Sequence, residues 1–196
     1  IIVPMGAWVF GQACEVARAI RHTGDDTPLT VSINVSARQL QRPDFPELVA
    51  RTARDAGVDP TTLCLEVSES ALLEDLDTMG DALSALKDVG VQLAIDDFGT
   101  GGSSLTYLRR YPFDQLKIDR MFVEGLGRSA ADDAIVAATI DMAHALGMVV
   151  SAEGVETEEQ QQRLAELGCD RAQGYHLGAP EELATPRLVL VRQQPA

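Results

Sequence analysis

The chain has 196 residues, 45% of them hydrophobic, and a formal net charge of −14. This length and hydrophobic fraction suit one globular domain with a substantial core. The acidic charge argues against a nucleic-acid polymer as partner, because phosphate backbones need clustered Lys and Arg.

Helical and strand patterns alternate along the chain. A first helix is expected over residues 4–21, because Pro4 suits a first helical turn and residues 22–26 break the pattern. Apolar residues recur three and four positions apart in 76–86 and 135–146, which predicts two further amphipathic helices. Short apolar runs predict six strands, at residues 29–36, 63–68, 91–97, 114–119, 148–153 and 170–175.

The predicted strands share one pattern of polar residues. Side chains alternate between the two faces of a strand, so Leu63, Leu65 and Val67 oppose Cys64 and Glu66. One face of the sheet is therefore apolar and suits a layer of helices. The opposite face gathers polar residues near the carboxyl ends of the strands: Asn34, Glu66, Asp96, Lys117, Glu153 and Gln173. This grouping predicts a functional site.

Two parallel-sheet folds place polar groups at the carboxyl ends of strands, namely the doubly wound open sheet and the (β/α) barrel. An open sheet draws its ligand contacts from a few strands, whereas here every strand supplies one. We therefore expect an α/β fold of the TIM-like (β/α) barrel type. Such a barrel needs about eight strands, and only six are visible, so we expect the missing strands upstream of Ile1.

Four carboxylates are expected to converge at one end of this barrel: Glu66, Asp96, Asp97 and Glu153. Without cations these groups would repel one another. Oxygen-rich sites select hard cations such as Mg²⁺ or Mn²⁺, and two such ions can clamp the oxygens of a phosphoryl displacement. The sequence thus predicts two divalent ions, through which an acidic protein can bind an anionic substrate.

Six short blocks follow one another along the chain: SINVSA (32–37), LEVSES (65–70), IDDFGTG (95–101), LKID (116–119), AEGVET (152–157) and QGY (173–175). In order and spacing they resemble the signature blocks of EAL domains, which are bacterial cyclic di-GMP phosphodiesterases of modified TIM-barrel fold. One block alone is a weak signal, but six across nearly the whole chain are specific. The resemblance implies metal-dependent hydrolysis of one phosphodiester bond of cyclic di-GMP, which gives linear pGpG.

The resemblance also implies metal ligands. Asn34, Glu66 and Asp96 match the ligands of a first ion, and Asp97 and Glu153 match contributors to a second ion, with Asp96 bridging the two. The implied ions are Mg²⁺ or Mn²⁺.

Further roles follow from the same resemblance. Lys117 is similar to the family's lysine that holds and helps activate the attacking water, and Glu153 is its implied catalytic partner. Asp119 supports the same strand end, and Gln173 closes the far side of the site. Two carboxylates resemble groups that fix nearby loops, Glu69 and Glu156.

The chain departs from the family pattern in three places. The Glu-Ala-Leu block, with its metal-binding glutamate and a following arginine, is absent. We therefore expect no hydrolysis by residues 1–196 alone. Gly102 replaces a usual aromatic, and Ala179 replaces a frequent basic residue. Residues 1–192 are expected to form an EAL-type domain that lacks its N-terminal strands, and residues 193–196 a disordered tail.

Cyclic di-GMP is the implied partner. A second copy of the chain, in a homodimer, and a GGDEF or sensor domain in the full-length protein are the other candidates from the family. The three cysteines, Cys14, Cys64 and Cys169, form no CxxC pair, which favours reduced thiols and a cytoplasmic domain. No apolar run approaches the ~18 residues of a transmembrane helix, although an upstream segment could anchor a longer protein.

Each of the predicted site residues has a structural alternative. Asp96 with Asp97 could start a turn and cap a helix, and only their convergence with Glu66 and Glu153 favours metal binding. Lys117 could be an ion-pair partner of a neighbouring carboxylate.

The remaining alternatives concern Lys117, Asn34, Gln173 and the glycine-rich segment. The partner of Lys117 in such an ion pair would be Asp119, Asn34 could cap the segment that follows it, and Gln173 could satisfy buried backbone groups. The glycines at 99–102 favour a flexible loop over a phosphate loop, because no Gly-Lys-Ser/Thr follows them.

Two other classes of function stay open. The domain could be a degenerate EAL receptor that binds cyclic di-GMP without cleaving it, or a module that interacts with a partner protein. The retained carboxylates and Lys117 argue against both, because a site freed from catalysis has no need of a costly cluster of like charges.

Overall fold

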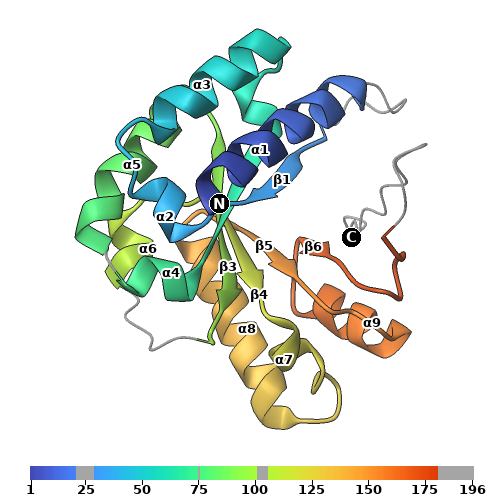
Figure 1. Cartoon of the computed structure of the whole chain (residues 1–196). Helices are drawn as coiled ribbons and strands as arrows, with labels where there is room; N and C mark the ends of the chain where they lie inside the picture. The colour runs from blue at the N-terminus through green and yellow to red at the C-terminus, as the bar shows by residue number, and fades with distance from the viewer. Residues whose placement is uncertain (21–28, 75, 101–105, 181–196) are drawn as a thin grey trace. The chain divides into compact units, whose positions relative to one another are not determined.

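The computed structural model describes residues 1–20, 29–74, 76–100 and 106–180. The helix break expected at residues 22–26, Gly102 and the tail at 193–196 lie outside the described residues. Figure 1 shows helices and strands in alternation. The strands are β1 (Val31–Asn34), β2 (Leu63–Ser68), β3 (Gln92–Phe98), β4 (Gln115–Ile118), β5 (Val149–Ala152) and β6 (Arg171–Ala172). The helices are α1 (Ile2–Ala19), α2 (Ala37–Leu40), α3 (Phe45–Ala56), α4 (Glu69–Glu74), α5 (Leu76–Val89), α6 (Thr106–Arg110), α7 (Arg120–Val123), α8 (Ala130–Ala145) and α9 (Glu158–Glu166).

The six strands follow one another in chain order across the sheet, from β1 to β6. The pairs β1–β2, β4–β5 and β5–β6 are parallel. Helices connect successive strands, as parallel pairing requires. The predicted α/β class and the six strands of the TIM-like (β/α) barrel are confirmed.

The chain divides into two compact units. The first comprises Ile1–Ile95 and Gly101–Phe113. In this unit α1 packs against α3 and β1, and α3 packs against α5 (Figure 1). Its core consists of fully buried apolar side chains from the strands and helices, which include Val49, Leu63, Leu65, Leu83, Leu86 and Leu93.

The second unit comprises Asp96–Thr100 and the chain from Asp114 onward. Helix α8 packs against β4, β5 and α7 (Figure 1). Its core includes side chains that expose 1% of their surface or less, among them Leu116, Val136, Ile140 and Val150.

Local sequence explains where several helices begin and end. The Ser129 side chain caps α8 by accepting a hydrogen bond from the Asp132 backbone N–H, at 3.3 Å. Thr157 and Gln160 bond each other's backbone N–H groups in a capping box that starts α9. Gly57 ends α3 with φ of 65°, a left-handed conformation that glycine adopts without strain.

Predicted and observed element boundaries differ at both ends of the chain. Helix α1 begins at Ile2 and ends at Ala19, a shift of two residues from the prediction. Strand β6 has only two residues, although the apolar run predicted six. Beyond it, Gln173 still donates its backbone N–H to Ala152, at 2.8 Å, and accepts from Val155, at 3.0 Å. The chain then follows the loop after β5, so regular pairing stops.

The polar face of the strands is less open than the sequence pattern indicates. Cys64 and Ala94 lie on that face and are fully buried. Glu66 and Lys117 expose only 7% and 8% of their surface. The face is therefore a second packed layer that carries its polar groups near the carboxyl ends of the strands.

Three cysteines are free thiols, and all of them are buried. No helix in the described part of the chain has both the length and the apolar character needed to cross a bilayer.

Candidate functional site

The first unit contributes two predicted metal ligands that are direct neighbours in the sheet. Asn34 on β1 pairs in register with Glu66 on β2, at the last position of β1. The ladder continues one residue further, because the Val35 backbone N–H donates to the Glu66 carbonyl at 2.8 Å. Residues in register share a face of the sheet, so the structure brings Asn34 and Glu66 together.

The second unit contributes a compact ionic cluster centred on Lys117. The Lys117 Nζ lies 3.0 Å from Asp96 Oδ1 and 2.6 Å from Glu153 Oε1. The side chains are largely enclosed, with exposed fractions of 10% for Lys117, 15% for Asp96 and 28% for Glu153. Charge-assisted hydrogen bonds at these distances are among the strongest that side chains form. The predicted convergence of these three residues is thus observed.

Strand register explains why these side chains meet. Lys117 on β4 pairs with Ser151 on β5, two residues before Glu153. The Glu153 backbone N–H donates to the Ile118 carbonyl at 3.1 Å, which holds Glu153 against the end of β4. Asp96 reaches the same ammonium group from β3.

Asp97 occupies an unusual backbone position. Its φ is 55°. Among the described residues, no other residue except glycine has a positive φ. Its carbonyl accepts hydrogen bonds from the Thr100 hydroxyl, at 2.8 Å, and the Thr100 backbone N–H, at 3.3 Å. The turn proposed as the structural alternative for Asp97 is therefore present. A left-handed residue interrupts the regular alternation of side chains between the two faces of the strand, and here this happens directly after Asp96.

The electrostatic surroundings of Asp97 are unfavourable to its charge. Burial, the neighbouring charges of Asp96 and Asp119, and a hydrogen bond shared with Asp119 raise the pKa of the Asp97 carboxyl above its usual value. Lys117 acts in the opposite direction, but its effect is smaller. An excess of carboxylates at this edge favours the binding of a further cation.

Asp119 has a structural role in addition to the predicted one. Its side chain caps α7 by accepting the Met121 backbone N–H at 2.8 Å. The cap fixes the carboxylate next to Asp97. The supporting role predicted for Asp119 at the end of β4 stays a prediction.

Glu69 is fully buried at the start of α4. It accepts a hydrogen bond of 2.8 Å from the hydroxyl of Tyr107, a residue of α6. Burial, and then the bond to Glu69, raise the pKa of Tyr107 well above its usual range. The loop after β3 leads into α6, so this bond connects Glu69 to the helix that follows the loop.

Gln173 and Glu156 are both exposed. The backbone of Gln173 bonds to Ala152 and Val155, and the backbone N–H of Glu156 donates to Gln160 Oε1 at 2.8 Å. These contacts are made by backbone atoms, so the roles predicted for the two side chains stay predictions.

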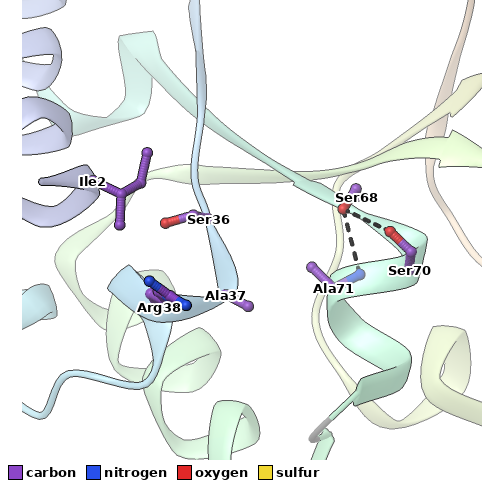
Figure 2. Close-up of a pocket in the computed structure, with 7 residues that line it drawn as sticks. All are labelled: Ile2, Ser36, Ala37, Arg38, Ser68, Ser70 and Ala71. Carbon is purple, nitrogen blue, oxygen red and sulfur yellow. Dashed lines mark hydrogen bonds between the residues drawn. The ribbon is translucent and has the colours of Figure 1, made fainter.

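A pocket of about 440 Å³ in the first unit was not predicted. Figure 2 shows Ser36 and Arg38 on one wall and Ser68 and Ser70 on the other. The available signal was their position, two to four residues after Asn34 or Glu66.

The donor chemistry of the site fits a hard divalent ion. The predicted ligands offer only carboxylate and amide oxygens near strand ends: Asn34, Glu66, Asp96, Asp97 and Glu153. Within the residues that the structure describes, no group of three His, Cys, Asp or Glu side chains lies close enough to hold one metal ion. The first two residues belong to one unit and the last three to the other, so the five-residue ligand set stays a prediction.

Comparison with characterised proteins supports the family assignment. The chain is 40% identical over 180 residues to MucR of Pseudomonas aeruginosa, described as a bifunctional diguanylate cyclase/cyclic di-GMP phosphodiesterase. The match covers 92% of this chain and 26% of MucR, so the chain spans about a quarter of that relative's length.

Solved structures agree. The PaMucR phosphodiesterase in complex with c-di-GMP superposes with a TM-score of 0.84 at 39% identity, covering 91% of this chain and 72% of that chain. The manganese/cy-diGMP complex of Klebsiella pneumoniae BlrP1 gives a TM-score of 0.77 at 32% identity, covering 88% and 42%. The family model described as "EAL domain" matches residues 1–180. Because this match spans most of the chain, the protein belongs to the EAL domain family.

Proposed function

We propose that the complete domain hydrolyses one phosphodiester bond of cyclic di-GMP and releases linear pGpG. The observation that carries the proposal is the Lys117 ammonium held between Asp96 and Glu153, at 3.0 and 2.6 Å. The two carboxylates hold the ammonium group in one position. A positive charge fixed in advance can stabilise the negative charge that develops on the phosphoryl oxygens in the transition state. The c-di-GMP complex of the related MucR phosphodiesterase supports the choice of substrate.

Two divalent ions, Mg²⁺ or Mn²⁺, complete the proposed site. Asn34, Glu66, Asp96, Asp97 and Glu153 would hold them. When bound, the ions would neutralise the phosphate and lower the pKa of a coordinated water. The BlrP1 complex that contains manganese supports this cofactor class.

The residues of the chain itself then have defined tasks. Lys117 holds the attacking water by hydrogen bonding and offers positive charge to the phosphoryl oxygens. The water oxygen forms a bond to phosphorus as the bond from phosphorus to the ribose O3′ breaks, and the proton that the water loses is passed on to O3′, which leaves as the 3′-hydroxyl. Glu153, which contacts Lys117, fixes the orientation of the ammonium group during this displacement.

The surrounding residues support the same end of the barrel. Asp119 holds the turn after β4, Gln173 closes the far side of the site, and two carboxylates fix nearby loops, Glu69 and Glu156. We propose activity for a domain that includes a Glu-Ala-Leu block, which residues 1–196 do not contain. Residues 1–192 are its proposed extent within this chain. The proposed setting is a cytoplasmic domain that works beside a GGDEF or sensor module and forms a homodimer.

The test is product analysis with the full-length gene product that contains residues 1–196. We expect chromatography to show pGpG after incubation of this protein with cyclic di-GMP and Mn²⁺, and unchanged substrate when EDTA is added. Asp96→Asn should abolish turnover, because a proposed metal ligand that also contacts Lys117 loses its charge. Asp141→Asn, the same change at an exposed position of α8, is the matched control and should leave turnover unchanged.

The alternative functions give different results. A receptor would bind cyclic di-GMP in calorimetry but leave it intact with Mn²⁺ present. A protein-interaction module would neither bind nor cleave it. Residues 1–196 assayed alone should give no pGpG, and product formation by them would show that the Glu-Ala-Leu block is dispensable.

A further inference from the structure

The loop that carries Glu153 runs from β5 to α9, over residues 153–157 (Figure 1). Two of its backbone N–H groups bond to neighbouring segments. The Glu153 N–H donates to the Ile118 carbonyl at 3.1 Å, at the end of β4. The Val155 N–H donates to the Gln173 carbonyl at 3.0 Å, just beyond β6. These bonds hold the first half of the loop against the ends of two strands.

One side chain of α9 holds the second half of the loop. Gln160 Oε1 accepts the backbone N–H of Glu156 at 2.8 Å and that of Thr157 at 3.0 Å. Gln160 exposes only 8% of its surface, and a hydrogen bond is stronger where water is excluded. Two consecutive N–H groups that bond to one buried oxygen restrict the backbone that joins them.

The residue directly after Glu153 makes this loop easy to deform. Gly154 has a φ of 73°, a left-handed conformation, and glycine has access to more backbone conformations than any other residue. A change in the Gly154 backbone would move the Glu153 carboxylate away from Lys117, whose Nζ now lies 2.6 Å from Glu153 Oε1. The hydrogen bonds that follow Gly154 therefore help to decide where Glu153 points.

The capping box at the start of α9 contains two separate contributions. Thr157 Oγ1 accepts the Gln160 backbone N–H at 3.2 Å, which caps the helix. Gln160 Oε1 bonds in the opposite direction, to the loop before the helix. One of these bonds can be removed by substitution while the other is kept.

We propose that Gln160 is a positioning residue that holds Glu153 against Lys117 through the loop at 153–157. Its importance for hydrolysis rests on the proposed function. Gln160 acts through the backbone of Glu156 and Thr157 and not on the reacting atoms. If Glu153 moves, the Lys117 ammonium group is no longer fixed in advance, and a displacement of about 1 Å can cost about a hundredfold in rate.

The kinetic test compares three variants of the full-length gene product. Gln160→Met keeps an unbranched side chain but removes the acceptor, so we expect kcat for cyclic di-GMP to fall about tenfold to a hundredfold, with KM within about threefold. Gln160→Glu supplies an oxygen acceptor at the same place and should return kcat to within about threefold of the unaltered protein. Thr157→Val is the matched control, because it removes only the hydroxyl that caps α9, and its kcat should stay within about threefold.

Hydrogen exchange, measured by mass spectrometry in EDTA and without substrate, tests the loop independently of turnover. Gln160→Met should accelerate exchange of the Glu153 and Val155 amides about tenfold or more. Thr157→Val should accelerate exchange only in the first turn of α9. Gln39→Met makes the same change in the capping box of α2, in the first unit, and should leave exchange at both places unchanged.

Three results would overturn the inference. An equal loss of kcat in Gln160→Met and Thr157→Val would mean that Gln160 only caps α9. Unchanged exchange of the Glu153 and Val155 amides in Gln160→Met would mean that Gln160 does not hold the loop. Unchanged kcat in Gln160→Met would mean that its hold on the loop does not serve the reaction. If the unaltered protein forms no pGpG, the proposed hydrolysis fails, and the exchange measurement alone then decides whether Gln160 positions Glu153.

Discussion

Replacing Lys117 by methionine tests the ionic cluster most informatively. Methionine keeps an unbranched stem of similar length but removes the ammonium group. Asp96 and Glu153 would then face each other without the cation that now lies 3.0 and 2.6 Å from them. We expect the variant to be less stable without divalent ions, and to lose turnover far more than affinity for cyclic di-GMP.

The size of both effects follows from the structure. Removing one partner of a buried ion pair costs about 3–5 kcal/mol. The three side chains retain 10%, 15% and 28% exposure, so screening reduces our figure to about 2–3 kcal/mol. In a domain of this size the midpoint of thermal unfolding should fall by roughly 4–12 °C. Loss of a group that acts in the transition state should lower kcat by about 10²- to 10⁴-fold, with substrate affinity within about tenfold.

The assay is thermal unfolding with EDTA and with Mn²⁺. At a Mn²⁺ concentration a hundred times its Kd, binding adds about 2.7 kcal/mol, so the ion should offset most of the loss. Lys87→Met alters the chain's only other lysine, which donates to the Val91 carbonyl at 3.3 Å. This control should cost less than about 1.5 kcal/mol and show no added response to Mn²⁺. An unchanged midpoint for Lys117→Met in EDTA, or no stabilisation of it by Mn²⁺, would refute the reasoning.

Three further predictions concern metal binding, pH and packing. Asp96→Asn should weaken Mn²⁺ binding in calorimetric titration, and unchanged affinity would remove Asp96 from the metal site. Tyr107→Phe should lower the free energy of unfolding in urea by about 1–3 kcal/mol at pH 8. The pKa of Tyr107 is raised in the folded protein. The stability that its hydroxyl contributes is therefore complete below the unfolded pKa of about 10 and is lost as the pH rises further. The phenylalanine variant should not show this loss of stability at high pH. Gly174→Ala should cost about 1–3 kcal/mol, because its new Cβ would overlap the backbone of Val155, whereas Gly178→Ala meets nothing within 4 Å and should be neutral.

The strands could be predicted because each is marked by a short apolar run in its own sequence. Strand β2 begins and ends where its apolar run does, at Leu63 and Ser68. Strand β6 was overestimated, since Gly174 packs against the Val155 backbone and the chain there follows a loop. Helices α3 and α9 were not predicted, although Pro46 and Gly57 mark the two ends of α3.

The site was predictable only in part. The alternation of side chains along the strands, together with the family resemblance, predicted that Asp96, Lys117 and Glu153 share one face of the sheet. The structure confirms that these three side chains meet. Their pairing depends on register between strands that are far apart in sequence, which residue patterns do not encode. The same holds for the Glu69–Tyr107 bond and for the Arg38 pocket, because each joins segments that follow different strands.

The central claim is that water cleaves cyclic di-GMP at the site that contains Lys117. The most direct measurement is mass spectrometry of the product formed by the full-length gene product in heavy-oxygen water with Mn²⁺. The account predicts pGpG with one heavy oxygen in its 5′-phosphate, and almost none from the Lys117→Met variant. Product without the heavy oxygen, or labelled product formed equally fast by the variant, would contradict it.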